Sequence, residues 1–507
     1  MISRSGDSRS RLVDAVANLV GRGASVLVSL ALIPVYLSYV GIEAYGLISL
    51  SVAIQAVFSL VDLGFSAVIL RETAKVSDEA AFDKGRLANL LRTFEFLFAA
   101  LALLLFVFSI TVLPTLGARW VTSSSIDPGT MRLAFLLVGC FITVKFMTLP
   151  YAGLLAGLQR QLLGNAISVS YVCLRGGGAV AIFAMGYSTI VAYYVWLLVA
   201  TMIELSVFAL LCWRLLGGRV WNARPEWALV LSNWRFARGV LSISASAAIF
   251  SQVDKMLLSR MLSLDQLGAY SVAAQLAVGL YNLVYPFATA ASPRLTQLSH
   301  NNDHAAASEL YLLYGQFGAL LTFPIGLVVI FFAEDIAYFY LRNPTVTAQV
   351  APLLRITMIG ALFGSLVPLP HALQLAKART ALIVGCNWLA IALILPGMWL
   401  VTGAYGAVGA AWIWALVNIL YVAIFLLAIE HGSGYRTLRG WADNVLLRPL
   451  LASLVFIVLG EQVASHLFHD RLVVVLATLS VSYVATFCLC GLARRNIVDV
   501  MRTLRTG

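Results

Sequence analysis

The chain has 507 residues, of which 61% are hydrophobic and only 11% are charged. A soluble domain carries about a quarter charged residues, so this composition excludes a soluble globular protein. Apolar runs of about 20 or more residues recur from end to end, and each could cross a hydrocarbon core of about 30 Å. No segment between them could hold a soluble domain of about 50 residues. We therefore expect an all-α polytopic membrane protein.

The net charge of +11 has a topological explanation. Fourteen spans are predicted, at residues 12–39, 43–70, 89–114, 132–157, 163–186, 189–216, 239–262, 267–293, 308–333, 348–376, 380–401, 406–430, 446–467 and 471–492. Alternate connections and both termini carry most of the basic residues, and the other connections carry only Arg119, Arg132, Arg260, Arg342, Arg355 and Arg471. The positive-inside rule then places both termini in the cytoplasm, and the charge does not indicate nucleic-acid binding.

The sequence contains an internal repeat. Glu-Ala-Tyr at 43–45 opens the second span, and Gly-Ala-Tyr at 268–270 opens the eighth. Leu-Pro-Tyr-Ala at 149–152 ends the fourth span, and Leu-Pro-His-Ala at 369–372 ends the tenth. The offset between equivalent motifs stays at about 220 to 225 residues. Two six-helix lobes related by a repeat are typical of alternating access around a central cavity.

The repeat predicts three segments. They are an N-terminal lobe with an interfacial linker at 1–230, a C-terminal lobe at 231–431, and two additional helices with a cytoplasmic tail at 432–507. In the linker, Trp227 and Trp234 flank an apolar position at helical spacing. This pattern fits either an amphipathic helix at the membrane interface or a solvated linker.

The most specific motifs lie in the predicted helices one, two, seven and eight. They are Ile-Pro-Val-Tyr-Leu at 33–37, Gly-Ile-Glu-Ala-Tyr-Gly-Leu at 41–47, Asp62-Leu63-Gly64 followed by Arg71, and Gly-Ala-Tyr at 268–270 after Asp254-Lys255. Together they resemble the signature of oligosaccharide flippases of the O-antigen translocase (Wzx) type, within the polysaccharide biosynthesis protein family.

This resemblance implies the fold of the multidrug/oligosaccharidyl-lipid/polysaccharide (MOP) exporter superfamily and a multi-pass location in the bacterial inner membrane. It implies an undecaprenyl-diphosphate-linked oligosaccharide as cargo, moved from the cytoplasmic to the periplasmic leaflet for O-antigen, lipopolysaccharide or exopolysaccharide synthesis. The further partners expected are membrane lipid, a polysaccharide polymerase and glycosyltransferases, with H⁺ or Na⁺ as a coupling ion. Neither the sugar nor the ion follows from the sequence.

Basic side chains at membrane depth are the candidate substrate-binding groups. A charge at a helix centre costs about 2.5–3.5 kcal/mol on insertion scales, so such residues usually face a cavity. Arg22 lies near the middle of the first span, on one face with Asn18, and Arg175 and Lys145 are central in their spans. Lys255, nearer the end of its span, either faces the cavity or extends to the surface. Guanidinium groups grip phosphate oxygens in a bidentate manner, so these cations suit a diphosphate.

Three acids at membrane depth allow two interpretations. Asp62, Glu204 and Asp254 could couple transport to protons or sodium, or they could pair structurally with the cations. The aromatic residues near 193–196 could likewise stack on sugar rings or belong to an interfacial belt.

Other function classes fit less well. A drug/cation antiporter of the same fold would be expected to have an acidic cavity, and a peptidoglycan-precursor flippase would share a basic one. A membrane glycosyltransferase or polymerase needs catalytic groups in a sizeable outer loop, whereas the longest such connection, about 115–131, offers Asp127 alone. We find no catalytic motif, metal-ligand spacing or cofactor signature, and predict a transporter that is not an enzyme.

Overall fold

The computed structural model describes residues 4–78, 83–218, 222–377, 379–433, 438–468 and 470–491. For residues 4–22, 24–25, 77–78, 428–433 and 438–439 it describes the backbone alone. The chain divides into two compact units, Met1–Gly268 and Ala269–Gly507, whose elements are all helical where they are described. The all-α fold predicted from composition is thereby confirmed.

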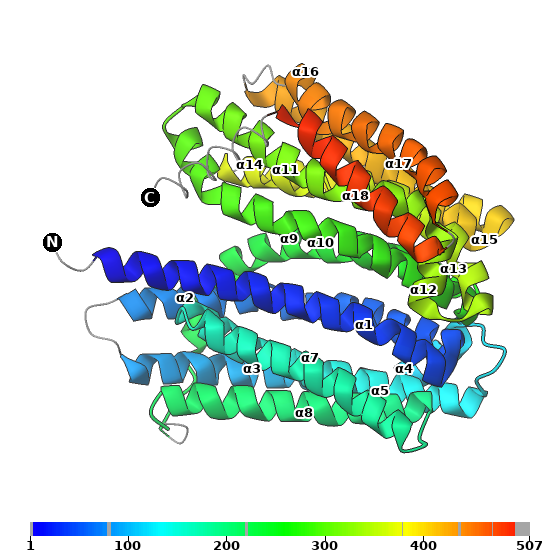
Figure 1. Cartoon of the computed structure of the whole chain (residues 1–507). Coiled ribbons are helices and arrows are strands. Elements are labelled where there is room, and N and C mark those ends of the chain that lie inside the picture. Colours follow the sequence, from blue (N-terminus) through cyan, green and yellow to red (C-terminus); the bar gives the residue numbers. More distant parts are fainter. Residues whose placement is uncertain are drawn as a thin grey trace. The chain divides into compact units, whose positions relative to one another are not determined.

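The described residues of the first unit form nine α-helices and one short 3-10 helix, and the unit ends within α10. They are α1 (Arg4–Phe58), η1 (Ser59–Asp62), α2 (Phe65–Asp78), α3 (Lys84–Thr111), α4 (Leu113–Trp120), α5 (Pro128–Phe146), α6 (Leu149–Gly157), α7 (Gln161–Ala184), α8 (Ile190–Leu215) and α9 (Trp227–Met261), followed by the start of α10 (Leu264–His300). Within this unit α1 packs along α7, and α8 packs against both α5 and α7 (Figure 1).

The second unit holds the rest of α10 and the helices that follow it. They are α11 (His304–Phe331), α12 (Ala333–Leu341), α13 (Pro344–Gly364), α14 (Pro368–Ala376), α15 (Thr380–Ser433), α16 (Leu438–Trp441), η2 (Ala442–Leu447), α17 (Arg448–Leu467) and α18 (Arg471–Leu489). The last two helices pack against α11, where the Tyr483 hydroxyl donates to the Leu321 carbonyl at 2.9 Å.

Twelve helical stretches in the described part are long and apolar enough to cross a membrane, so the chain is a multi-pass membrane protein. Two of them contain a glycine with non-helical backbone angles, Gly41 and Gly406, at the predicted junctions of spans one and two and of spans eleven and twelve. The count of fourteen spans, the cytoplasmic termini and the domain boundaries stay predictions.

Polar side chains mark where many helices begin. Asp83 accepts from the Gly85 and Arg86 amides at the start of α3, at 2.8 and 3.2 Å. Thr189 caps α8 and Asp303 caps α11 in the same way. Each cap satisfies a backbone N–H that the helix itself leaves without a partner. The helix starts therefore follow from local sequence.

The predicted second span is divided near its end. Leu63 and Gly64 both adopt left-handed backbone angles, with φ of 52° and 82°, so η1 stops and α2 begins anew. The Asp62 carboxylate accepts from the Ser66 amide at 2.9 Å and so caps α2. A Cβ on Gly64 would lie 2.2 Å from the Ala237 carbonyl oxygen, which only glycine permits. The start of α2 is thereby held against α9.

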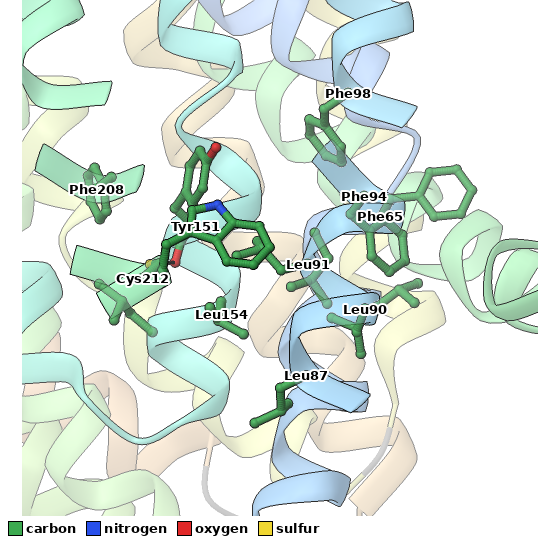
Figure 2. Packing of buried hydrophobic residues seen from close by; sticks show 14 of the residues in the cluster. Phe65, Leu87, Leu90, Leu91, Phe94, Phe98, Tyr151, Leu154, Phe208 and Cys212 are labelled. Atoms are coloured by element: carbon green, nitrogen blue, oxygen red, sulfur yellow. Dashed lines mark hydrogen bonds between the residues drawn. The ribbon is translucent and has the colours of Figure 1, made fainter. Parts of the chain in front are cut away.

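Aromatic residues build the core around α3 in the first unit (Figure 2). The rings of Phe65 and Phe94 lie 6.0 Å apart, and those of Phe98 and Phe146 stack at 5.0 Å. All four side chains are buried. Rings of this size bury about 150–250 Å² each, so this cluster fixes α2 and α5 on α3.

A single carboxylate connects three helices beside this core. Glu95 on α3 accepts from the Tyr151 hydroxyl at 2.8 Å and from the Trp213 indole at 2.7 Å. Arg92 also reaches it, at 2.9 Å, and its guanidinium lies 5.0 Å from the Trp213 ring. Because each donor comes with a defined geometry, Glu95 ties α3, α6 and α8 together.

The equivalent place in the second unit holds neutral groups. His371, which stands where Tyr151 stands in the repeat, contacts the Tyr421 hydroxyl at 3.1 Å. Tyr421 in turn donates to the Asn387 side-chain oxygen at 2.8 Å, and the Phe425 ring packs 4.9 Å from the imidazole. This network joins α14 to both parts of α15, before and after its kink at Gly406.

Candidate functional site

An ion pair lies in the interior of the first unit. Lys145, at the end of α5, places its Nζ 2.7 and 2.6 Å from the two carboxylate oxygens of Glu204 on α8. The Glu204 side chain is only 2% exposed. Breaking a buried pair by removing one partner costs about 3–5 kcal/mol, because the other charge is left without compensation. The structure thus shows Glu204 in the pairing role that was one of its two interpretations.

Two predicted cations meet on one aromatic ring. The Lys145 Nζ lies 4.2 Å from the Tyr171 ring centroid, and the Arg175 guanidinium carbon lies 5.9 Å from it. Tyr171 and Arg175 stand one turn apart on α7, and the Tyr171 hydroxyl hydrogen-bonds to Thr201 on α8 at 3.1 Å. Cation–π contact contributes about 0.5–2 kcal/mol, so the ring helps to hold both cations inside the lobe.

Arg175 differs from Lys145 because, in the described part of the chain, it forms no direct ion pair with an acid. Its buried Nε has no hydrogen-bond partner there, and neither has the buried hydroxyl of Tyr36 on α1. The Tyr36 ring meets the Tyr193 ring edge-on at 5.5 Å. Arg175 is therefore a partly buried guanidinium among tyrosines, next to a Lys–Glu pair whose charges cancel. This cluster can receive an anion.

The charged residues of this cluster were predicted from the sequence, but some of the neutral residues that surround them were not. Thr201 carried no signal beyond its place in an apolar helix, and Tyr36 was singled out only as part of the motif at 33–37. Two of the aromatic residues near 193–196 make hydrogen bonds inside the lobe, and their contact with a sugar stays a prediction. Tyr194 is fully buried and donates to the Leu47 carbonyl at 3.0 Å, and Trp196 donates to the Leu174 carbonyl at 3.1 Å. Both bonds fasten α8 to its neighbours.

The other predicted site residues lie elsewhere. Lys255 on α9 contacts Gln252 at 3.3 Å, and its neighbour Asp254 is buried. Within the described residues, no hydrogen bond or ion pair links Lys255 or Asp62 to the cluster around Arg175. The side chains of Asn18 and Arg22 lie outside the described residues. In the part of the chain that the structure describes, no group of three or more His, Cys, Asp or Glu is placed to hold a metal ion.

Comparison with known families places the chain. The sequence profile of the family described as polysaccharide biosynthesis protein matches residues 12–299, more than half of the chain. The chain belongs to the polysaccharide biosynthesis protein family. A second profile, described as MatE, matches residues 243–400. The family assignment made from the motifs in the predicted helices one, two, seven and eight is confirmed.

Individual proteins that are similar to this chain agree with its place in the family. A Shigella flexneri protein named "Putative O-antigen transporter" is 20% identical over 81% of this chain and 96% of its own length. A structure titled "Lipid II flippase MurJ, inward closed conformation" matches with a TM-score of 0.73 and 14% identity, over 96% of this chain and all of that one. An inward-facing multidrug resistance MATE family transporter of the MOP superfamily matches with a TM-score of 0.59 and 12% identity, over 81% and 96%.

At these identities the solved structures establish the fold alone, which this chain shares with the lipid II flippase and the MATE family transporter. The relatives are transporters and flippases, not enzymes. This protein is accordingly a multi-pass membrane transporter.

Proposed function

We propose that this transporter flips an undecaprenyl-diphosphate-linked oligosaccharide from the cytoplasmic to the periplasmic leaflet of a bacterial inner membrane, by alternating access. The observation that carries this proposal is the partly buried guanidinium of Arg175, whose buried Nε has no hydrogen-bond partner and which forms no ion pair among the described residues. The family and the name of the Shigella flexneri relative support a saccharide destined for a surface polysaccharide.

The charge balance of the cluster favours an anionic cargo. Glu204 neutralises Lys145, so Arg175 adds a net positive charge to the interior of the lobe. An unpaired buried ion costs several kcal/mol, and an arriving phosphate would relieve that cost. A guanidinium offers two parallel N–H groups to phosphate oxygens, and nearby tyrosine hydroxyls can donate to the same group. A drug cation would be repelled at this place.

Each residue receives a distinct role in this proposal. Arg175 binds a phosphate oxygen, with the Tyr36 hydroxyl as a second donor. Lys145 is a positioned cation whose ammonium Glu204 holds in place. Arg22 and Asn18, predicted on one face of the first span, would extend the basic surface along α1, and Lys255 would contact the cargo elsewhere on its path.

Ion coupling would have to act through groups that already have contacts. Both carboxylate oxygens of Glu204 accept from Lys145, and Asp62 caps α2. A proton or Na⁺ binding at Glu204 would release the lysine, whereas Asp254 offers a buried carboxylate on α9. We propose coupling by H⁺ or Na⁺ at one of these acids, and the loss of ion-gradient dependence in single acid-to-amide variants would identify which.

The decisive experiment measures surface polysaccharide per membrane-inserted protein. Arg175→Ala should abolish export, Arg175→Lys should restore it only in part because an ammonium cannot form the bidentate fork, and Arg175→Gln should fail. Arg132→Ala, which removes an exposed arginine at the start of α5, is the matched control and should export normally. Wild-type export from a stably inserted Arg175→Ala variant would rule out the anionic-cargo mechanism.

Two rivals of the same fold are separated by complementation. The MatE profile match favours a multidrug/cation antiporter, and the fold similarity to the lipid II flippase favours a peptidoglycan-precursor flippase. The gene should restore surface polysaccharide in a strain that lacks its own flippase. Restored drug resistance, or rescue of a strain depleted of its lipid II flippase, would favour the corresponding rival instead.

A further inference from the structure

An open pocket lies in the first unit, away from the cluster around Arg175. It has a volume of 760 Å³ and is lined by Ala67, Leu70, Arg71, Ala74, Lys75 and Phe236. Five of these residues come from α2 and the sixth from the first turns of α9. We call it the α2–α9 pocket.

The lining combines an alkyl wall with two cations. Ala67, Leu70 and Ala74 recur at spacings of three and four along α2, so they share a face. Arg71 and Lys75 stand one turn apart beside this wall, and both are exposed. No lining residue is an amide or a hydroxyl group. The pocket can therefore bind a charged head and a hydrocarbon chain, and its lining offers no side-chain hydrogen-bond acceptor for a sugar hydroxyl.

Arg71 is available to a ligand. Its guanidinium lies over the Phe236 ring, 4.6 Å from the centroid, and within the described residues it has no hydrogen bond or ion pair. Stacking fixes the plane of the guanidinium while leaving its N–H edges open. Lys75 is held by Glu72 at 2.6 Å; Glu72 is buried, whereas the Lys75 side chain is half exposed. An ammonium has three N–H donors, so Lys75 can keep this contact and still donate to a phosphate oxygen.

The start of α9 has the character of a membrane-interface helix. Trp227, Leu231 and Trp234 recur at spacings of four and three and are 49%, 78% and 44% exposed. Arg235 and Arg238 are exposed on the same turns. Exposed Trp and Leu next to Arg are typical of a helix at the headgroup level of a bilayer.

The walls of the pocket are fixed relative to each other. The Trp234 ring packs 5.9 Å from the Phe65 ring at the start of α2, and the Gly64 backbone touches Ala237. The pocket is thus a preformed feature at headgroup depth, where membrane lipid is the most abundant molecule with both an anionic head and an alkyl chain.

We propose that the α2–α9 pocket binds an anionic phospholipid of the membrane, with its phosphate on Arg71 and Lys75 and an acyl chain along Ala67, Leu70 and Ala74. The lipid fastens the start of α9 to α2 at the bilayer surface. This binding is separate from cargo recognition and does not depend on the proposed function, because no residue is shared with the cluster around Arg175.

The test uses the delipidated full-length protein in detergent, with phosphatidylglycerol as the anionic probe and phosphatidylcholine as the zwitterionic one. Bound lipid is counted by native mass spectrometry, and the melting temperature is followed in parallel. We expect phosphatidylglycerol to bind about tenfold more weakly to Arg71→Gln, the loss of one charge-assisted contact. The affinity of Arg71→Lys for phosphatidylglycerol should lie between those of the wild type and Arg71→Gln. Arg160→Gln, which changes an exposed arginine outside the pocket, should bind phosphatidylglycerol as the wild type does.

A second variant protects the test against misfolding. Ala74→Phe fills the alkyl wall without touching a charge, and it should also lose phosphatidylglycerol while eluting as the same monodisperse species. Equal binding to Arg71→Gln and Arg160→Gln would overturn the proposal, as would equal binding of the two lipids by the wild type. Displacement of bound phosphatidylglycerol by undecaprenyl diphosphate at equimolar concentration would overturn it in favour of a cargo site.

Discussion

Tyr151 and His371 occupy the same position of the Leu-Pro-x-Ala motif in the two repeats, yet they meet different partners. Tyr151 donates to a carboxylate, Glu95, that also binds an arginine, whereas His371 contacts the neutral Tyr421. The difference extends to each unit as a whole. The buried polar residues of the first unit include four acids, Glu43, Glu72, Glu204 and Asp254, whereas all those described in the second unit are neutral.

A shared helical plan thus carries two kinds of interior. Neutral hydrogen bonds contribute about 0.5–1.5 kcal/mol each and lose little when one partner changes, but buried charges are costly to leave unpaired. The first unit should therefore be sensitive to single charge deletions and the second should tolerate changes in its polar network. This contrast agrees with placing the proposed phosphate contact in the first unit.

The largest effect should follow from breaking the Lys145–Glu204 pair. Glu204→Ala leaves a buried ammonium without its partner, so we expect a loss of about 3–5 kcal/mol in the free energy of unfolding. The double variant Lys145→Met, Glu204→Leu should recover most of it. Chemical unfolding in mild detergent measures both, with Glu309→Ala, an exposed acid on α11, as the control. A double variant as unstable as Glu204→Ala would contradict the pairing role.

A smaller difference in the free energy of unfolding should separate variants of the Glu95 network in the first unit from variants of the His371 network in the second. Glu95→Leu leaves the Tyr151 hydroxyl and the Trp213 indole without an acceptor, and each unsatisfied group costs about 1–3 kcal/mol. His371→Phe keeps the bond between Tyr421 and Asn387, so we expect a loss of about 1 kcal/mol. The same unfolding assay compares the two variants. Equal losses would remove the contrast between an ionic and a neutral interior.

The kink glycines should behave alike in both units, because their role depends on backbone and not on charge. Gly41 and Gly406 have φ of 80° and 58°, and an Ala at either place should cost about 1–3 kcal/mol in strain. Gly177→Ala and Gly385→Ala are matched controls, since both glycines sit in regular helix with open space around them. The controls should be neutral or slightly stabilising. Strain at only one kink would show that the repeats differ in backbone as well.

The smallest effect concerns a charge at the end of α14 in the second unit. Burial, and then the neighbouring Arg379, lower the pKa of Lys377 to about 8 from its ordinary value of 10.5. The folded state therefore holds fewer protons than the unfolded state between these values, and stability should rise slightly as pH increases from about 8 to 10.5. Lys377→Gln should flatten this rise in a pH series of melting temperatures. An identical slope in both proteins would assign the rise to other groups.

The helical fold and the family could be predicted because both depend on local signals. Apolar runs give spans directly, and the motifs at 33–37 and 41–47 lie within a few turns of each other. Pairing could not be predicted in the same way. Lys145 and Glu204 were both candidates, but they stand on different helices, and only the packing of α5 against α8 shows that they meet. Sequence spacing along one helix says nothing about such a contact.

Two further features escaped prediction for a related reason. The break at Leu63 places a leucine in left-handed backbone, which no local preference favours and which the packing around Gly64 imposes. Tyr36 belongs to a family motif, but its buried hydroxyl became visible only once α1 lay against α7 and α8. Both features depend on neighbours that are distant in sequence.

The close contact between Gly64 and the Ala237 carbonyl also determines the order in which parts of the first unit can fold during synthesis. The chain leaves the ribosome from its N-terminus at about 5–20 residues per second, so α2 is made well before the segment against which it packs. The turn at Leu63–Gly64 has no such support until α9 has emerged. A nascent chain stalled before residue 237 should therefore expose this turn to protease, and one stalled beyond the end of α9 should protect it. The first unit can therefore complete its folding only after α9, which follows the sixth predicted span, has been synthesised.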